Sequence, residues 1–170
     1  IDLGLSERSS PWENMIIEAD NFDALRWLRM THRGRIRCVF VDPPYGTGSI
    51  RRGYNDRFTL GADTYRQSAW LEYLHRRLIV AGELLTEDGV ILVAINDEHR
   101  SLLELVMRQA LPGMRIGSLV WRTRNGSNLD QGGLSSDHEH ILVASKGAFS
   151  FSGVERSYST YSNPDDDHRG

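Results

Sequence analysis

Residues 38–49 read CVFVDPPYGTGS, an apolar run that ends in an acid, two adjacent prolines and a tyrosine. Val39, Phe40 and Val41 predict a short buried strand, because β-branched and aromatic residues follow one another without polar alternation. The two prolines end this strand, since neither has an N–H to donate and each fixes φ at about −65°. A carboxylate and an aromatic ring are therefore held just past the carboxyl end of a strand, where open α/β sheets bind ligands.

Length and composition indicate one ordinary globular domain. The chain has 170 residues, of which 39% are hydrophobic and 25% charged. No apolar run approaches the roughly 18 residues of a membrane span, and no secretory signal precedes the first expected strand. Cys38 is the only cysteine, which excludes a disulfide framework and a thiolate metal cluster, and we expect it to be buried as a small hydrophobe. A cytoplasmic protein fits best.

The net charge of −3 hides a segregated distribution of basic residues. All of them except Lys146 are arginines, and the stretches 24–41 and 105–129 carry arginines without any acid. Such stretches can contact a nucleic-acid backbone, because arginine binds phosphate in a bidentate manner. They can equally be solvated helix and loop faces, which charge alone favours.

Hydrophobic periodicity predicts strands and helices in alternation. Strands are expected at 15–19, 38–41, 90–95, 116–121 and 141–145, and helices between Asn21 and Gly34, at 65–86 and at 98–111. The segment 87–89 predicts a turn, Asn96 and Asp97 predict a helix cap, and 42–64 and 123–137 predict loops. This alternation is typical of an α/β fold, with a mostly parallel sheet that helices cover on both faces.

The segment DPPY, from Asp42 to Tyr45, resembles the catalytic motif of S-adenosylmethionine-dependent amino-methyltransferases. The surrounding segments follow, in order and spacing, the Mod subunits of type III restriction-modification systems, which belong to the β class of these enzymes. These segments are IIEADNFDALRWL, YNDRF at 54–58, WLEYLHRRLIVAGELLTEDGVILVAINDEH at 70–99, HEHILVASK at 138–146 and NPDDDHRG at 163–170. The resemblance covers the chain from about residue 14 onward.

The resemblance implies a Rossmann-like methyltransferase fold that transfers a methyl group from S-adenosylmethionine to N6 of a flipped adenine in DNA. It implies an N-terminal extension at 1–13, a partial catalytic domain at 14–150 and a tail at 151–170 leading toward a target-recognition region. The catalytic residues would be Asp42, Pro43, Pro44 and Tyr45, and the cofactor-binding residues Asp20, Asn21, Asp42 and Pro44. Arg51, Arg52, Arg57, Arg122 and Arg124 would contact double-stranded DNA. The implied partners are a second methyltransferase subunit and a restriction subunit, with no membrane.

The chemistry of the motif agrees with this activity. The exocyclic amine of adenine is a poor nucleophile, so methyl transfer needs an acceptor that holds its hydrogens as charge develops. The carboxylate of Asp42 and the carbonyl of Pro43 can do this, because the prolines fix their direction. Tyr45 offers a face on which a base flipped out of the duplex can stack. The alternative is a Pro-Pro turn at a strand end with a packed tyrosine.

Other features are less specific. Asp20 can lie at the rim of a cofactor pocket or simply cap a helix. Residues 46–48 lack the third glycine of a dinucleotide fingerprint and would give flexibility to a loop over the base. His138 and His140 share one face of a strand, with Glu139 between them, but no further ligand is evident and no metal is expected. Asn96 stands where the related enzymes commonly have Asp.

The glycine loop F-x-G-x-G, with which the related methyltransferases bind the methionine end of the cofactor, does not occur in the sequence. We therefore expect the catalytic portion of a longer enzyme that is inactive alone, or one part of a split enzyme. Two further alternatives stay open: a cytosine-N4 or RNA adenine methyltransferase, and a non-catalytic DNA-binding subunit. An aspartate at position 42 favours adenine, since the cytosine enzymes more often carry serine there.

Overall fold

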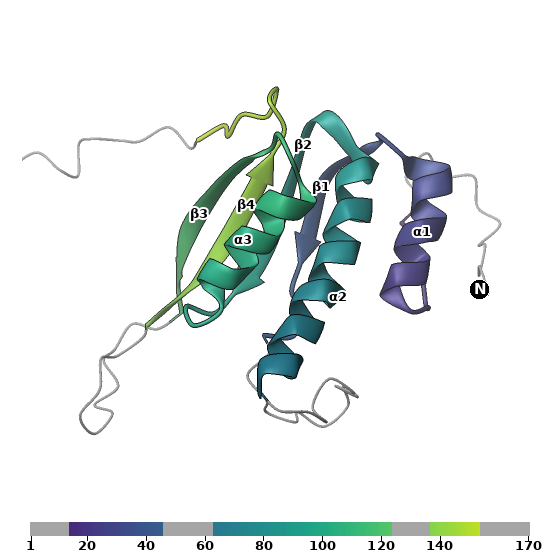
Figure 1. Ribbon diagram of the computed structural model, residues 1–170. Coiled ribbons are helices and arrows are strands. Elements are labelled where there is room, and N and C mark those ends of the chain that lie inside the picture. Colours follow the sequence, from purple (N-terminus) through teal and green to yellow (C-terminus); the bar gives the residue numbers. More distant parts are fainter. Residues whose placement is uncertain (1–13, 46–62, 124–136, 154–170) are drawn as a thin grey trace, which may run out of the picture.

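The computed structural model describes residues 14–45, 63–123 and 137–153, which form an α/β arrangement of three helices and four strands (Figure 1). The elements in chain order are α1 (Asn21–His32), β1 (Ile36–Val41), α2 (Asp63–Leu84), β2 (Leu85–Ile95), α3 (Arg100–Ala110), β3 (Arg115–Arg122) and β4 (His138–Ser145).

The four strands form one mixed sheet in the order β1-β2-β4-β3. β1 and β2 are parallel, as the alternation of strands and helices predicts, whereas β4 runs antiparallel to both β2 and β3. Parallel pairing therefore holds for the β1–α2–β2 unit, and β3 also runs in the direction of β1 and β2, so β4 is the one reversed strand of the described sheet. Because β4 inserts between β2 and β3, the strand that comes last in the described chain lies in the middle of the sheet.

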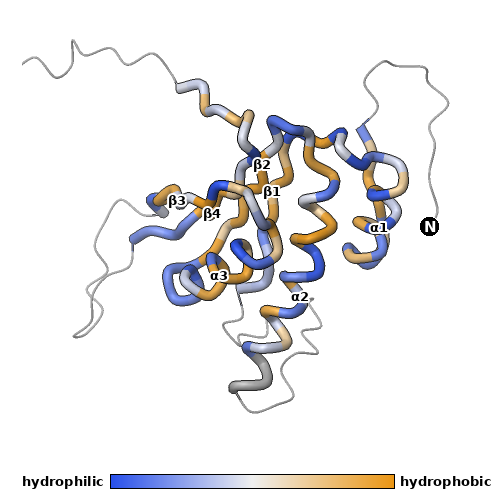
Figure 2. Tube along the Cα trace, turned by 45° about the horizontal axis from the view of Figure 1, so that its top comes forward, coloured by the Kyte–Doolittle hydropathy of each residue, from blue (hydrophilic) through white to orange (hydrophobic). Residues whose placement is uncertain are grey.

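The hydrophobic core lies between the sheet and the helices α2 and α3. Figure 1 shows all three helices on the same side of the sheet. Ile91, Val93 and Ile95 of β2 are fully buried and face Leu103 and Met107 of α3 in the core cluster. Hydrophobic residues concentrate in the central strands, while the helices alternate hydrophobic and hydrophilic positions (Figure 2). This pattern follows the period of an amphipathic helix on a buried strand.

The opposite face of the sheet is not covered by any described helix, which differs from the expected cover on both faces. Phe40 of β1 and Trp121 of β3 are 61% and 60% exposed, and alternation along their strands puts both on this face. Cys38 lies on the same face of β1 and is exposed, so the expectation of a buried cysteine is wrong. An apolar run in the sequence predicts a strand, but it does not indicate which face of that strand a helix covers.

Two expected elements differ from the structure. The stretch 15–19 forms no strand and no strand pairing among the described residues, and Ile16 is 96% exposed. β2 begins at Leu85, which pairs with Ile36 of β1, and so includes the expected turn at 87–89. The register breaks at that segment, because Cys38 pairs next with Val90 and residues 86–89 have no register partner in β1, so the turn signal marks an irregularity within the strand.

The ends of the helices follow recognisable signals. The carboxylate of Asp20 accepts the backbone N–H of Phe22 at 2.8 Å and caps α1, and Gly34 follows this helix at a φ of +66°. α3 begins at Arg100, after a turn in which the side-chain oxygen of Asn96 accepts the backbone N–H of His99 at 3.1 Å. Asn96 therefore supports the entry to α3 as expected, although His99 occupies the cap position itself.

The described helices include none with the length and apolar character that a bilayer span requires. The expected extension at 1–13 and all but the first few residues of the expected tail at 151–170 lie outside the described residues. The division of the chain at residues 14 and 150 therefore stays a prediction.

Leu103→Ala should lower the free energy of unfolding by about 2–5 kcal/mol, because it leaves a cavity where a fully buried side chain stood. The matched control is Leu105→Ala on the same helix, where the side chain is 65% exposed and the cost should stay below about 1 kcal/mol. Urea unfolding measures both variants, and equal losses would contradict the described packing of α3.

Candidate active site

The motif that follows β1 lies at an edge of the sheet where several other segments meet. β1 and β2 are parallel, so Asp42 and Asn96, which follow them, lie at the same edge. Ile95, the last residue of β2, pairs with His140 near the beginning of β4, which brings the segment 138–140 to this edge as well. Sheet register thus gathers side chains that lie far apart in the sequence.

The two prolines of the motif are held by a tryptophan from α2. All described peptide bonds are trans, Pro43 is buried, and the indole Nε1 of Trp70 donates to the carbonyl oxygen of Pro44 at 2.6 Å. Trp70 is itself buried in the core and contacts the ring of His99 edge-on at 5.5 Å between centroids. The proline rings therefore restrict the backbone of the motif, and the hydrogen bond from Trp70 ties it to the core. The side chain of Asp42 stays exposed.

Tyr45 is half-buried beside two carboxylates. Its hydroxyl donates to Oε2 of Glu139 on β4 at 3.2 Å. Burial raises the pKa of Tyr45 to about 12, helped by the negative charges of Glu139 and Asp42 and by hydrogen bonds to both. The phenol therefore stays protonated at neutral pH, and its hydrogen bond fixes one edge of the ring.

Asp20 and Asn21, the expected cofactor residues at the start of α1, are engaged at the junction with α2. Asp20 caps α1 and lies 3.8 Å from a guanidinium nitrogen of Arg77. Asn21 donates to the hydroxyl of Tyr73 at 3.0 Å and accepts from Nε of Arg77 at 2.6 Å. The capping role of Asp20 is thus confirmed, and its cofactor role stays a prediction. Both residues are exposed, and their side-chain oxygens are acceptors of the kind that the ammonium and hydroxyl groups of a cofactor such as S-adenosylmethionine require.

Most arginines of the first basic stretch have acidic partners in the structure. Arg29 and Arg33 both lie within 4.0 Å of Glu83 on α2, Arg26 pairs with Asp23, and Arg37 pairs with Asp88; the distances are 3.7, 3.4, 3.7 and 3.2 Å. In the second stretch Arg108 pairs with Glu104 at 2.8 Å, and Arg115 donates to the carbonyl of Phe149 at 2.7 Å. The interpretation as solvated surface faces therefore holds for these positions.

The expected DNA-binding arginines are mostly not described. Arg51, Arg52, Arg57 and Arg124 lie outside the described residues, as do the glycines at 46 and 48. Arg122 ends β3, is exposed, and pairs in register with His138, so it lies at the same edge of the sheet as the motif. Its role in DNA binding stays a prediction.

Sequence reasoning missed three side chains that shape this edge: Trp70, Glu139 and Asp97. Trp70 and Glu139 support the motif from α2 and from β4. Asp97, which was expected only to cap a helix, accepts from the ring of His140 at 3.0 Å. Alternation puts Glu139 on the face opposite His138 and His140, but it does not predict the contact with Tyr45, which lies 94 residues away in the chain. The nearness of Asp97 to β4 could not be predicted either, since it depends on the antiparallel pairing of β2 and β4.

Comparisons with known proteins agree on one family. The sequence profile of the N6/N4 DNA methylase family matches residues 36–169. The Mod subunit of the type III restriction-modification enzyme EcoP15I from Escherichia coli is 28% identical over 164 residues, which cover 82% of this chain and 25% of that protein. The probable type III HindVI Mod subunit from Haemophilus influenzae is 37% identical over 98 residues, covering 58% of this chain and 12% of that protein.

Among solved structures, the complex of M1.HpyAVI with S-adenosylmethionine is similar with a TM-score of 0.55 and 14% identity, over 83% of this chain and 60% of that one. The similarity supports the Rossmann-like methyltransferase fold that the sequence predicts. The chain spans a quarter or less of the length of the two Mod relatives.

Trp70→Phe should lower the free energy of unfolding by about 1–3 kcal/mol, because the partly buried carbonyl of Pro44 loses its donor while most of the ring volume is kept. Trp27→Phe on α1 is the matched control, with a smaller expected loss, since this half-buried ring lies away from the core cluster. Chemical denaturation of both variants is the measurement, and a loss at Trp70 no larger than at Trp27 would argue against the bond.

Glu139→Gln should lower the pKa of Tyr45 from about 12 toward 10, because it removes a negative charge that opposes ionisation of the phenol. Titration of ¹³C-labelled tyrosine by NMR, assigned with Tyr45→Phe, measures this shift. Glu98→Gln is the control, since Glu98 is exposed and forms an ion pair with His99. An unchanged Tyr45 pKa in Glu139→Gln would show that the two side chains do not interact in solution.

Proposed function

The chain belongs to the N6/N4 DNA methylase family, and we propose that it carries the catalytic motif of an enzyme that transfers a methyl group from S-adenosylmethionine to N6 of adenine in DNA, within a type III-like restriction-modification system. The names of the Mod relatives support the type of system. Because the chain spans only part of those relatives, the activity, the substrate and the partners of the whole protein belong to this proposal.

The observation that carries the proposal is an exposed carboxylate on a rigid backbone beside a protonated phenol. Asp42 follows a strand end that two prolines and Trp70 hold, and its charge acts on Tyr45. Methylation of an aromatic amine requires an acceptor that draws the amine hydrogens out of the ring plane, so that the nitrogen lone pair becomes available. An acceptor that is already oriented supplies this without reorganisation during the reaction.

Tyr45 would hold the target base. Only an extruded base can bring its amine to Asp42, because a paired adenine is held in the base stack with one amine hydrogen bonded to thymine. The ring of Tyr45 is half-buried and its hydroxyl is tied to Glu139, so its orientation is set before a base arrives. A stacking platform that is already ordered loses less side-chain entropy on binding.

S-adenosylmethionine, when bound, supplies an electrophilic methyl group on a sulfonium. Asp20, Asn21, Asp42 and Pro44 would hold it, with exposed oxygens of the first three accepting its ammonium or hydroxyl hydrogens. The carbonyl of Pro44 is bonded to Trp70, so Pro44 would contribute chiefly by fixing the direction of Asp42. The proton released from the amine would pass to the Asp42 carboxylate or to solvent.

We propose double-stranded DNA as the binding partner, contacted by Arg51, Arg52, Arg57, Arg122 and Arg124, with a second methyltransferase subunit and a restriction subunit as protein partners. Arg122 supports this assignment through its place at the edge of the motif. DNA as substrate fits the expected cytoplasmic location, which stays a prediction.

In the intact enzyme, Asp42→Ala should lower the single-turnover rate of methyl transfer about a hundredfold to a thousandfold, because one oriented acceptor is lost at the reacting amine. DNA affinity should stay nearly unchanged, since the effect falls on the chemical step. Transfer of labelled methyl to duplex DNA measures the rate, and a mobility-shift assay with fluorescently labelled DNA measures binding.

Asp23→Asn on the exposed face of α1 is the matched control, and it should retain the methyl-transfer rate of the enzyme without substitutions. Tyr45→Ala should instead weaken retention of the flipped base by about 1–3 kcal/mol, reported by a fluorescent base analogue at the target position. Retention of the full rate by Asp42→Ala would disprove the catalytic role. Methylation of cytosine or RNA in place of DNA adenine, or DNA binding without transfer, would favour the corresponding alternatives.

A further inference from the structure

Three side chains that can bind a metal ion converge at the edge where β2 ends and β4 begins. Asp97 follows β2, and His138 and His140 lie on one face of β4. Their ligand atoms all lie within 4.8 Å of one another. We propose that Asp97, His138 and His140 form a binding site for one divalent transition metal ion of the Zn²⁺ type, a site that is distinct from the methyl-transfer motif.

The separation of the ligand atoms fits a shared ion. Nε2 of His140 lies 3.0 Å from Oδ1 of Asp97. Two ligands that each lie about 2.1 Å from a tetrahedral ion are about 3.4 Å apart, so a small opening of this pair accommodates the metal. The rings of His138 and His140 are 5.1 Å apart and nearly perpendicular, at 82°, so their edges are presented in different directions. Two imidazoles and a carboxylate are a donor set that Zn²⁺ accepts readily.

Ser118 holds the imidazole of His140 from its other side. The hydroxyl oxygen of Ser118 on β3 lies 3.2 Å from Nδ1 of His140. A hydrogen bond at one ring nitrogen fixes the orientation and tautomer of a metal-binding histidine and leaves the other nitrogen for the ion. Without an ion, Nε2–H donates to Asp97; with an ion bound, Nδ1–H would donate to Ser118 and the lone pair of Nε2 would face the ion.

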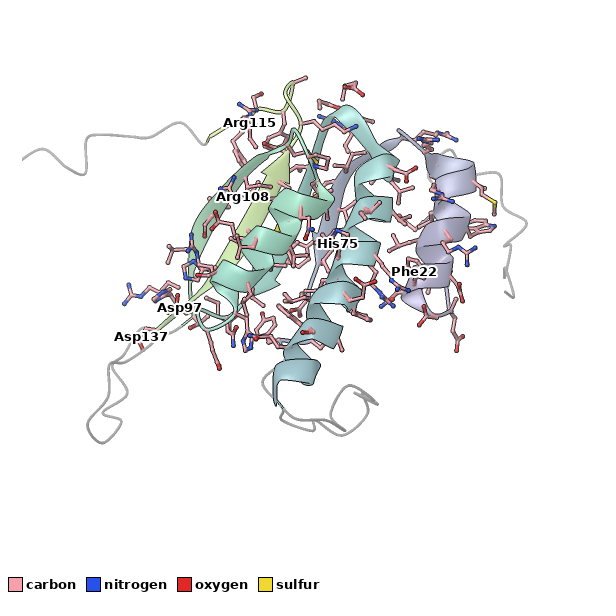
Figure 3. All side chains as sticks on the ribbon, in the orientation of Figure 1. Phe22, His75, Asp97, Arg108, Arg115 and Asp137 are labelled. Carbon is pink, nitrogen blue, oxygen red and sulfur yellow. The ribbon has the colours of Figure 1, made fainter. Side chains whose placement is uncertain are left out.

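The surroundings allow an ion to enter and then hold it. The side chain of His140 is 10% exposed and that of Asp97 is 62% exposed, so the cluster is anchored on the core side and open to solvent on the other. Water would complete the coordination on the open side. Figure 3 shows Asp97 at the end of the sheet beside Asp137, well away from His75 on α2.

The alternative is a plain hydrogen bond, in which Nε2–H of His140 donates to Asp97 without any ion. This accounts for the His140–Asp97 contact, and strand alternation with the ring contact accounts for the nearness of His138, so the two alternatives differ in whether His138 binds an ion together with that pair. In the proposed site the ion takes the place of that proton at Nε2, and the proton of the neutral imidazole moves to Nδ1, from which it is donated to Ser118. The ion would join the end of β2 to the start of β4 through His138 and His140, the two neighbours of Glu139 in the chain.

The test is binding of Zn²⁺ to protein purified without a histidine tag and stripped with a chelator, measured by equilibrium dialysis and isothermal titration. We expect one ion per chain at micromolar free Zn²⁺. His138→Gln and Asp97→Asn should each weaken binding at least tenfold, and Ser118→Ala should weaken it roughly tenfold to a hundredfold through the second-sphere bond. Co²⁺ in the same site should show visible absorption bands that His138→Gln abolishes.

His75→Gln is the matched control, because this histidine lies on α2 outside the cluster, and it should leave binding unchanged. Circular dichroism of each metal-free variant separates a lost ligand from a lost fold, and His138→Gln and Asp97→Asn change more exposed positions than His140. Absence of stoichiometric Zn²⁺ binding, or equal weakening by His138→Gln and His75→Gln, would overturn the proposal. None of these measurements depends on methyl transfer.

Discussion

The pairing of β2 with β1 on one side and with β4 on the other is the constraint on which the rest of the structure depends. β2 contributes the fully buried Ile91, Val93 and Ile95, its parallel partner leads into the DPPY motif, and its antiparallel partner carries the segment His138–His140. A shift of either register by one residue would turn the buried side chains of β2 to the opposite face. The same shift would separate Tyr45 from Glu139 and His140 from Asp97, so packing of the core and assembly of the edge are specified together.

Much of this architecture could be predicted from local sequence patterns. All three helices lie within a few residues of the expected ranges, and the strand before the two prolines was expected where β1 lies. The order of the strands was not predictable, because periodicity reports the face that a residue occupies and not the strand that it pairs with. The exposure of Cys38 shows this limit, since its apolar neighbourhood indicates burial while the helices cover only the other face of the described sheet.

The candidate site divides in the same way. Asp42 and Tyr45 could be identified because adjacent prolines leave a strong local signature. Trp70 and Glu139, which hold that motif from α2 and β4, could not, because a tryptophan within a helix and a glutamate within a strand have many other uses. Supporting contacts of this kind depend on tertiary pairing, and single-sequence reasoning reaches them only after the topology is known.

The attachment of α1 has a consequence for the dynamics of the molecule. None of its side chains is buried, and it is held against α2 by ion pairs with Glu83, by the hydrogen bonds of Asn21, and by the guanidinium of Arg77, which lies 5.4 Å from the ring centre of Phe22. Contacts of this kind add little to stability in water and weaken as ionic strength rises. We therefore expect α1 to open locally at a smaller free energy than the buried core elements, and its amide protons to exchange with solvent ahead of those in β2. Asp20 and Asn21 stand at its first turn, so occupancy of that end by a ligand and closure of the helix would be thermodynamically linked, each favouring the other.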